Sequence, residues 1–335
     1  MVAAFLFAVA GGIFIWRAVA TPYKGYSGDR IQVEVRHGWN TATILRTLEQ
    51  AGVLRDDFVP LIYLKILHRG ESLKAGVYRF DGESSPVEVI AKMIRGDVVL
   101  KSVTIPEGWD RFAITDLMIH EGFGTRSEWK KELGDTELIA DLDPQATSLE
   151  GYLFPDTYKL APGTAVKTIV QEMVSNFHKH FGPELAFISN DMDVHNTVVL
   201  ASIVETEARI PAERPLIAAV YLNRMKRHML LQADPTVIYA LKRAGEWNGD
   251  IRRVDLKIDS PYNTYRYHGF PPGPIANPGM ASLQAAAHPA DTPYLYFVSR
   301  NDGTHVFATT LAEHNRNVAV HQKKFWRDRR SAANR

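Results

Sequence analysis

The sequence predicts an α+β protein with three parts: an apolar N-terminal segment, a small α/β module and a larger, mainly helical domain with a β-hairpin. Three observations support this prediction. Residues 1–16 contain no charged side chain, residues 31–104 alternate between strand and helix patterns, and helical spacing dominates from residue 163 onward. A chain of 335 residues is long enough to form two domains with separate cores.

The N-terminal segment predicts a single-pass membrane anchor over residues 1–20. Its apolar stretch reaches the minimum of about 17 residues for a spanning helix when Arg17 extends to the interface. The alternative is a cleaved secretory signal, because residues 18–20 have the small-x-small form of a cleavage site. Both interpretations place the rest of the chain outside the cytoplasm. Residues 21–30 are polar and predict a short linker.

Residues 31–104 predict one compact module. Apolar and polar residues alternate over 31–35, which is typical of a strand. Ser85 followed by Glu88 forms a capping box at the start of a later helix. Residues 75–80 predict a second, short strand, and residues 98–105 predict a further strand that closes the module.

The rest of the chain predicts a connecting region over 105–149 and a mainly helical domain over 150–335. An aromatic loop rich in turn residues is expected at 148–163. The stretch "VVLASIVETEARI" predicts a buried helix that carries Glu205. The sequence Asn-Asp-Gly at 301–303 lies between two strand patterns and predicts a hairpin.

Composition excludes several classes of function. The 39 Lys and Arg residues balance 38 Asp and Glu residues, so the basic surface of a nucleic-acid-binding protein is not expected. The absence of cysteine excludes disulfides and thiolate chemistry. The 12 histidines form no HExxH motif, and no phosphate-binding glycine loop is present. We therefore expect neither a metal nor another cofactor.

Glu205 lies on a helix face with the small residues Ala201 and Ser202, which allows close approach of a ligand. Burial favours the protonated form of a carboxyl group, and a protonated carboxyl can give its proton to a leaving oxygen, as in glycosidases. Glu207 faces a different side, so the two acids do not form a pair. The alternative interpretation of Glu205 is an ordinary ion pair with Arg209, four residues further on.

The loop 260–279 is too rich in Pro and Gly to form a helix or central strand. Its aromatic side chains lie among amides and hydroxyls, a combination that suits sugar rings. These aromatic residues are Tyr262, Tyr265, Tyr267 and Phe270. The alternative is a stiff loop whose tyrosines only cover the core. Gln232 and Asp234 are further polar candidates, although Asp234 alone is typical of a helix N-cap.

Several long motifs together carry a family resemblance. They are "EGYLFPDTY", "ASIVETEA", "MLLQADPTVIYAL", "SPYNTYRYHGFPPGPIANPG", "SLQAAAHPADTPYLYFV" and "GTHVFATTLAEHN". In this order and at these separations they closely resemble the endolytic murein transglycosylases of the MltG (YceG-like) family. The resemblance covers nearly the whole chain. It implies a LysM-like module at 31–104 and a catalytic domain at 150–335.

The resemblance implies a bacterial envelope enzyme. Such an enzyme is anchored in the inner membrane, with its catalytic part in the periplasm. It cuts peptidoglycan glycan strands internally, between N-acetylmuramic acid and N-acetylglucosamine, and leaves 1,6-anhydromuramic ends. It terminates nascent strands beside the peptidoglycan synthases, which are its expected partners.

The resemblance also implies functional residues. Glu205 corresponds to the catalytic glutamate. The implied substrate-binding residues are Glu150, Tyr152, Asp156, Gln232, Asp234, Tyr262, Asn263, Thr264, Tyr265, Asn277 and His305. Among them, Asn263 and Gln232 are candidates to stabilise the substrate's N-acetyl group.

Three alternatives to this interpretation stay open. Glu207 replaces Glu205 as the catalytic acid in the first. In the second, the protein is a hydrolase that uses Glu150, Asp156 or Asp234 as a second carboxylate. In the third, it is a wall-binding scaffold without catalytic activity.

Overall fold

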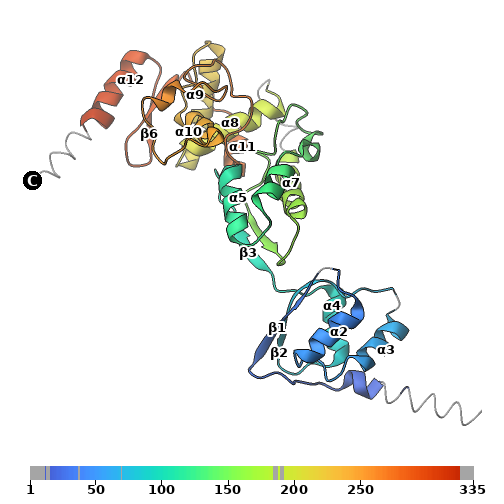
Figure 1. Cartoon of the computed structure of the whole chain (residues 1–335). Coiled ribbons are helices and arrows are strands. Elements are labelled where there is room, and N and C mark those ends of the chain that lie inside the picture. The colour runs from blue at the N-terminus through green and yellow to red at the C-terminus, as the bar shows by residue number, and fades with distance from the viewer. Residues whose placement is uncertain are drawn as a thin grey trace, which may run out of the picture. The chain divides into compact units, whose positions relative to one another are not determined.

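The computed structural model describes residues 12, 16–36, 38–68, 70–183, 188 and 192–324. Residue contacts divide the chain into two compact units. Unit 1 is Met1–Ser102 with Lys159–Thr164, and unit 2 is Val103–Tyr158 with Ala165–Arg335. The structure is mostly helical with small two-stranded sheets, which confirms the predicted α+β class (Figure 1).

Most of the predicted anchor, residues 1–20, lies outside the described residues. Within the part of the chain that the structure describes, no helix has both the length and the apolar character needed to cross a bilayer.

Unit 1 contains a two-stranded antiparallel sheet packed with three helices. Its elements are β1 (Arg30–Val35), α2 (Thr41–Gln50), α3 (Phe58–Leu67), β2 (Gly76–Asp81) and α4 (Pro86–Arg95). Val33 and Val35 of β1 are buried while their neighbours are exposed, as the sequence alternation predicts. Val33 lies opposite the buried Tyr78 of β2, so this face of the sheet forms the core of unit 1.

The capping signals around α4 are confirmed. The Ser85 hydroxyl accepts a hydrogen bond from the Glu88 N–H, and the Glu88 carboxylate accepts one from the Ser85 N–H over 2.8 Å. Gly96 follows the helix with a φ of 79°, a left-handed conformation that glycine adopts without steric cost. Local sequence therefore determines both ends of α4.

The strand predicted at 98–105 differs in extent and partner. Only Lys101–Thr104 forms a strand, β3, and it pairs with β4 (Thr157–Leu160) instead of closing the sheet of β1 and β2. Strand β4 lies inside the stretch 148–163 that we expected to be a loop. The division between the two units falls within this strand pair.

Unit 2 is built mainly of helices. They are α5 (Arg111–His120), α6 (Arg126–Glu132), α7 (Val166–Phe181), α8 (Val194–Glu207), α9 (Arg214–Lys226), α10 (Asp234–Ala244), α11 (Met280–Ala287) and α12 (Leu311–Val318). Short turns of 3-10 helix occur at η1 (Thr136–Ile139), η3 (Pro211–Glu213) and η4 (Asp255–Lys257), and a π-helical turn, η5 (Ala319–Lys324), follows α12.

Helix α8 is the central element of unit 2. Every residue from Thr197 to Val204 is buried, and α8 packs against α9, α10 and α11 (Figure 1). A helix that is apolar on all sides is expected to be an interior helix. Glu205 follows directly after this buried stretch, so the core of unit 2 fixes its position.

The predicted hairpin is also confirmed. Strands β5 (Tyr296–Ser299) and β6 (His305–Ala308) pair antiparallel, with Phe297 opposite Phe307. Asn301, in the connecting turn, has a φ of 66°, which asparagine tolerates better than most residues.

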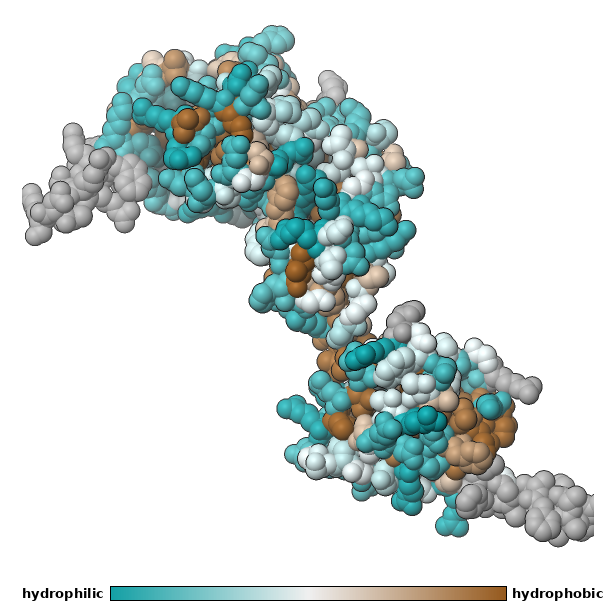
Figure 2. Space-filling view, viewed as in Figure 1, coloured by the Kyte–Doolittle hydropathy of each residue, from teal (hydrophilic) through white to brown (hydrophobic). Residues whose placement is uncertain are grey.

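Unit 1 exposes apolar side chains on α3. Phe58, Ile66 and Leu67 are all exposed, and apolar surface gathers on this side of unit 1 (Figure 2). Val59 of the same helix lines a pocket together with Arg17 and neighbouring residues. Helix α3 therefore adjoins the end of the predicted anchor and the residues that follow it.

Candidate active site

Glu205 lies in the last turn of α8, and 6% of its side chain is exposed. Two donors from other elements hold its carboxylate. Arg214 Nη2, at the start of α9, donates to Oε1 over 3.1 Å, and the Gly279 N–H, just before α11, donates to Oε2 over 3.0 Å. Both contacts stabilise the carboxylate and fix its orientation.

The ion pair with Arg214 excludes the expected alternative in which Glu205 pairs with Arg209. Helix α8 ends at Glu207, and the backbone of the next residue, Ala208, is extended (φ −84°, ψ 119°), so Arg209 does not occupy the next helical turn. Arg209 is exposed, whereas 9% of the Arg214 side chain is exposed. Arg214 is further positioned by a bond from its Nε to the Ser282 hydroxyl of α11, over 2.9 Å.

A second carboxylate, Glu107, shares the same arginine. Its Oε2 lies 4.0 Å from Arg214 Nη2, and 53% of its side chain is exposed. Partial burial and the negative charge of Glu205 raise the pKa of Glu107, against the opposing effect of Arg214. A Cβ at Gly279 would meet a Glu107 carboxylate oxygen at 1.9 Å, so only glycine permits this approach.

Sequence reasoning did not identify Glu107. The only signal was its position in a Pro-Glu-Gly turn directly after an apolar strand. Such a turn occurs in many proteins without catalytic function, and the pairing of this turn with residue 279 has no local signature.

Backbone contacts bring the two loops of this site together. The Gly108 N–H donates to the Asn277 carbonyl and the Asn277 N–H donates to the Trp109 carbonyl, each over 2.9 Å. A Cβ at Gly108 would lie 3.4 Å from Cγ of Glu205. These bonds place the Glu107 turn and the chain before α11 against the end of α8.

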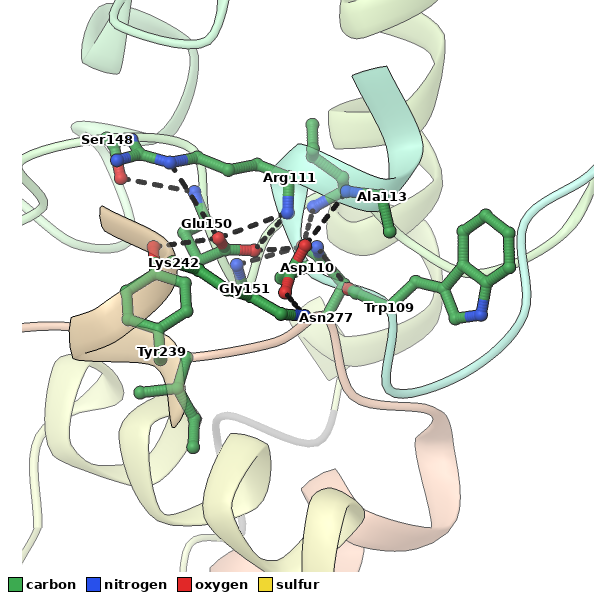
Figure 3. Close-up of polar contacts among 12 residues, drawn as sticks. Trp109, Asp110, Arg111, Ala113, Ser148, Glu150, Gly151, Tyr239, Lys242 and Asn277 are labelled. Atoms are coloured by element: carbon green, nitrogen blue, oxygen red, sulfur yellow. Dashed lines mark hydrogen bonds and ion pairs between the residues drawn. The ribbon is translucent and has the colours of Figure 1, made fainter. Parts of the chain in front are cut away.

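Glu150 lies next to this site but faces the interior, with 1% of its side chain exposed. Its carboxylate accepts hydrogen bonds from the Arg111 N–H, from Asn277 Nδ2 over 2.9 Å and from the Tyr239 hydroxyl over 2.8 Å. Figure 3 shows these partners around the Glu150 side chain. Burial, with the nearby negative charge of Asp110, raises the pKa of Glu150 to about 7.

Asn277 completes this buried network. Its Oδ1 accepts the N–H groups of Gly151 and Leu153, over 2.8 and 3.0 Å, while its Nδ2 donates to Glu150. Glu150 and Asn277 therefore hold the loops that frame Glu205. Direct contact of either residue with substrate stays a prediction.

Tyr152 and Asp156 occupy different environments. Tyr152 is fully buried, and its hydroxyl donates to Asp143, which also contacts Nδ1 of His195 at 2.7 Å. Asp156 is exposed beside the β3–β4 pair, where its carbonyl accepts the Ile105 N–H. The structure does not bring either residue into contact with Glu205.

The Tyr-Asn-Thr-Tyr stretch is fixed by buried polar bonds. Asn263 Nδ2 donates to the carbonyls of Leu256 and Ile258, over 3.0 and 2.8 Å, so its amide donors are already used. The Thr264 hydroxyl accepts the Ala233 N–H over 3.0 Å. Because Asn263 is completely buried, the expectation that its amide stabilises an N-acetyl group is not supported by its geometry.

Gln232 is exposed, like Asp234 two residues further on. Its N–H donates to the Thr264 carbonyl over 3.1 Å, and its backbone has a φ of 52°, which is uncommon for a residue with a long side chain. Neighbouring contacts therefore hold Gln232 in a strained conformation that presents its side chain to solvent.

The aromatic residues of the loop divide between core and surface. Tyr262 is buried against Tyr239, with ring centroids 5.0 Å apart. The Tyr265 hydroxyl donates to Asp234, and burial is the main cause of the raised pKa of Tyr265. Tyr267 is exposed and donates to Asp259 over 2.6 Å. Of these three rings, Tyr267 offers the most accessible surface for a sugar.

Glu207 has different partners from Glu205. Its Oε1 accepts the Tyr221 hydroxyl over 3.2 Å, and burial followed by the charge of Asp234 raises its pKa to about 7. The two acids therefore do not form a pair, as the helical spacing predicts.

His305, on β6, contacts the segment that carries Arg214. Its Nδ1 lies 2.7 Å from Oε2 of Glu213, and its N–H donates to Oε1 of the same carboxylate over 3.0 Å. Because Glu213 directly precedes Arg214, His305 helps to position the arginine that binds Glu205. Among the described residues, no cluster of three or more His, Asp or Glu side chains has a geometry suited to a metal ion.

Comparisons with known proteins find similarity to one protein family. The profile of the YceG-like family matches residues 33–320. An endolytic murein transglycosylase of Bacillus subtilis is 32% identical over 327 residues, which is 92% of this chain and 89% of the relative. One of Streptococcus pneumoniae serotype 2 is 29% identical over 93% of this chain, which spans 62% of that protein's length. The crystal structure of a YceG-like protein of Listeria monocytogenes, 33% identical, gives a TM-score of 0.59 and covers 87% of this chain and 99% of that one.

Proposed function

The chain belongs to the YceG-like family, as the sequence motifs indicated, and on this basis we propose that it is an endolytic murein transglycosylase. It cleaves peptidoglycan glycan strands internally, at the bond between N-acetylmuramic acid and N-acetylglucosamine, and forms 1,6-anhydromuramic ends. The names of the Bacillus and streptococcal relatives support the activity. The structural observation on which the proposal rests is that the Glu205 carboxylate is buried and accepts two hydrogen bonds, one from Arg214 and one from the Gly279 N–H.

The reaction needs one group that gives a proton and then recovers it. Glu205 protonates the glycosidic oxygen while the bond from that oxygen to C1 breaks. As a carboxylate it then removes the proton from the C6 hydroxyl of the muramic residue, whose oxygen bonds to C1. The proton returns to Glu205, so the reaction consumes no water and needs no second catalytic carboxylate.

The neighbours of Glu205 have complementary roles in this cycle. Arg214 and the Gly279 N–H stabilise the carboxylate, which is the form that recovers the proton. Glu107, from its partly exposed position, approaches the same Arg214 nitrogen to 4.0 Å. Gln232 presents its exposed amide to the substrate's N-acetyl group.

A hydrolase is the second candidate, because Glu107 lies beside Arg214. Three acids were considered as a second carboxylate. Glu150 is enclosed in its own network, Asp156 lies beside the β3–β4 pair, and Asp234 accepts a hydrogen bond from the Tyr265 hydroxyl. Glu107 instead shares an arginine with Glu205 and is open to solvent, a suitable place for a base that activates water.

Cleavage in water enriched in ¹⁸O separates the two reactions. The purified full-length chain in detergent is incubated with uncrosslinked glycan strands, and the new ends are analysed by mass spectrometry. A transglycosylase gives anhydro ends without ¹⁸O and fragments from internal cuts. Incorporation of one ¹⁸O atom at each new end would instead establish hydrolysis.

We further propose that the protein works at the bacterial inner membrane, with unit 2 in the periplasm and a peptidoglycan synthase as partner. The uncharged sequence 1–16 and the exposed apolar face of α3 support the membrane location. Unit 1 is proposed to be a LysM-like module, which the order β1–α2–α3–β2 and its antiparallel sheet support. Flotation of the full chain with lipid vesicles tests the membrane location.

A further inference from the structure

Unit 2 contains a cavity that the proposed reaction does not use. It has a volume of about 450 Å³ and lies between the start of α5, helix α6 and the end of α10. Four of its lining side chains are cationic: Arg111, Arg126, Lys130 and Arg243. No carboxylate belongs to the described lining, and we call this cavity the basic pocket.

The positive charge of the basic pocket is only partly neutralised. Arg126 contacts Asp116 over 2.6 Å, but both side chains are exposed, and surface ion pairs of this kind contribute about 0–1 kcal/mol. Arg111 Nε lies 3.9 Å from the buried Glu150. Among the described residues, Lys130 forms neither an ion pair nor a hydrogen bond. An anionic ligand can therefore bind without breaking a strong internal contact.

The other walls of the pocket indicate which anion fits. Phe112 and Leu133 supply apolar surface, while Thr147 and Ser148 supply hydroxyl groups. Separated cations around mixed apolar and polar walls suit an aliphatic chain with several carboxylates. A volume of about 450 Å³ is within the usual range for small-ligand sites.

A compact phosphate group fits this arrangement less well. Diphosphate sites commonly use convergent backbone N–H groups, often at the start of a helix. At the start of α5 two of these donors are occupied: the Arg111 N–H donates to Glu150 and the Ala113 N–H donates to the Asp110 side chain. The pocket therefore presents side-chain cations and not a cradle of free amides.

We propose that the basic pocket binds the carboxylates of the short peptide that muramic acid carries on a peptidoglycan strand. This proposal rests on the proposed function, since it concerns the same substrate. Glycan chains without peptide lack these carboxylates. The pocket thus distinguishes peptide-bearing strands from bare strands.

The basic pocket and Glu205 are connected through a short, fixed segment. Arg111 is three residues from Gly108, so their Cα atoms are at most about 11 Å apart. Gly108 packs against Glu205, while Arg111 bonds through its N–H to Glu150. A peptide bound in the pocket therefore constrains the glycan strand close to Glu205.

Kinetics on two substrates test the proposal. The full-length wild type and Lys130→Glu are compared on strands that carry their peptides and on strands from which an amidase has removed them. We expect Lys130→Glu to raise KM about tenfold or more on peptide-bearing strands, with kcat within twofold. On bare strands the wild type and Lys130→Glu should have KM and kcat values within twofold of each other.

Lys131→Glu is the matched control. Lys131 belongs to the same helix and is 83% exposed, but it does not line the pocket. It should behave like the wild type on both substrates, and all three proteins should have the same thermal unfolding midpoint. Equal KM values for Lys130→Glu and Lys131→Glu on peptide-bearing strands would overturn the proposal.

Direct binding separates failure of the pocket from failure of the proposed function. Calorimetry measures binding of a free stem tetrapeptide, of the same peptide with its carboxylates converted to amides, and of inorganic pyrophosphate. We expect the free peptide to bind the wild type and the inactive Glu205→Gln variant equally, and Lys130→Glu about tenfold more weakly. The amidated peptide should not bind.

Each contrary outcome has a distinct meaning. Binding of pyrophosphate without binding of the peptide would overturn the peptide assignment. Strand cleavage by the wild type without peptide binding would contradict the proposed role of the basic pocket but leave the proposed function intact. Peptide binding by a wild-type protein that does not cleave strands would contradict the proposed function but support peptide binding in the basic pocket.

Discussion

Arg214 and Glu205 are nine positions apart in sequence, yet Nη2 of the arginine lies 3.1 Å from Oε1 of the glutamate. Both side chains are almost completely buried, and they come from different helices, α9 and α8. The contact forms because α8 ends at Glu207 and the chain returns through η3. This ion pair positions the proposed catalytic carboxyl group, and Ser282 in turn positions the arginine.

Arg214→Met should lower both activity and stability. The substitution leaves the buried Glu205 without its charged partner, and removal of one member of a buried ion pair typically costs about 3–5 kcal/mol. Arg214→Lys should be intermediate, because one ammonium group cannot replace the planar group that contacts both Glu205 and Ser282. Urea unfolding and kcat measure the two effects.

Arg209→Met is the control for this pair. Arg209 is exposed and lies beyond the end of α8, so its removal should change the free energy of unfolding and kcat only slightly. Wild-type stability in Arg214→Met would show that the ion pair does not contribute as described.

Gly279→Ala should lower kcat by displacing Glu107 from Arg214. The added Cβ would lie 1.9 Å from the Glu107 carboxylate, so this half-exposed side chain must move aside. The Gly279 N–H that donates to Glu205 can stay in place, so we expect a smaller loss than in Glu205→Gln. Steady-state kinetics with circular dichroism, which verifies the fold, is the measurement.

Gly182→Ala is the comparison for Gly279→Ala. A Cβ at Gly182 meets no atom within 4 Å, and this position should therefore tolerate alanine without loss of activity. If Gly279→Ala retained full activity, the close packing of Glu107 against residue 279 would not matter for catalysis.

The Glu150 network should make stability depend on pH. The pKa of Glu150 is raised from 4.5 to about 7, so the folded state favours the protonated form. The stabilisation of the folded state by protonated Glu150 is fully present below about pH 4.5 and is lost as the pH rises to about 7. The reason is that Glu150 ionises at a lower pH in the unfolded chain than in the folded protein. The loss is about 3 kcal/mol of unfolding free energy.

Glu150→Gln should flatten this dependence between pH 5 and 7, since an amide does not titrate. Denaturant unfolding at several pH values measures the difference from the wild type. Glu137→Gln, at an exposed position in η1, should keep the wild-type pH dependence. Parallel curves for Glu150→Gln and the wild type would contradict the assigned protonation.

Local signals predicted a large part of the fold. The capping box of Ser85 and Glu88, the turn at Asn301 and the all-round apolar pattern of α8 each depend on residues close in sequence. The pairing of β3 with β4 was not predicted, because it joins segments about fifty residues apart and β4 has only four residues. Sequence periodicity indicates that a strand forms but not which strand it pairs with.

The site was predictable to a smaller extent. The burial of Glu205 and its separation from Glu207 followed from helical spacing. Arg214 and Glu107 did not, because their contacts with each other and with Glu205 depend on where α8 ends and on how two distant loops pair. Asn277 is in the motif that carried the resemblance, but its buried bonds to Glu150, Gly151 and Leu153 emerge only in the folded chain.

Turnover of the Glu205→Gln variant on glycan strands tests the central claim most directly. We predict that its cleavage rate falls by at least about 10²–10⁴-fold with an unchanged fold, because a glutamine cannot give and recover a proton. Glu207→Gln should retain most activity and form anhydro ends like those of the wild type. Wild-type turnover by Glu205→Gln would contradict the assignment of the proton shuttle to this residue.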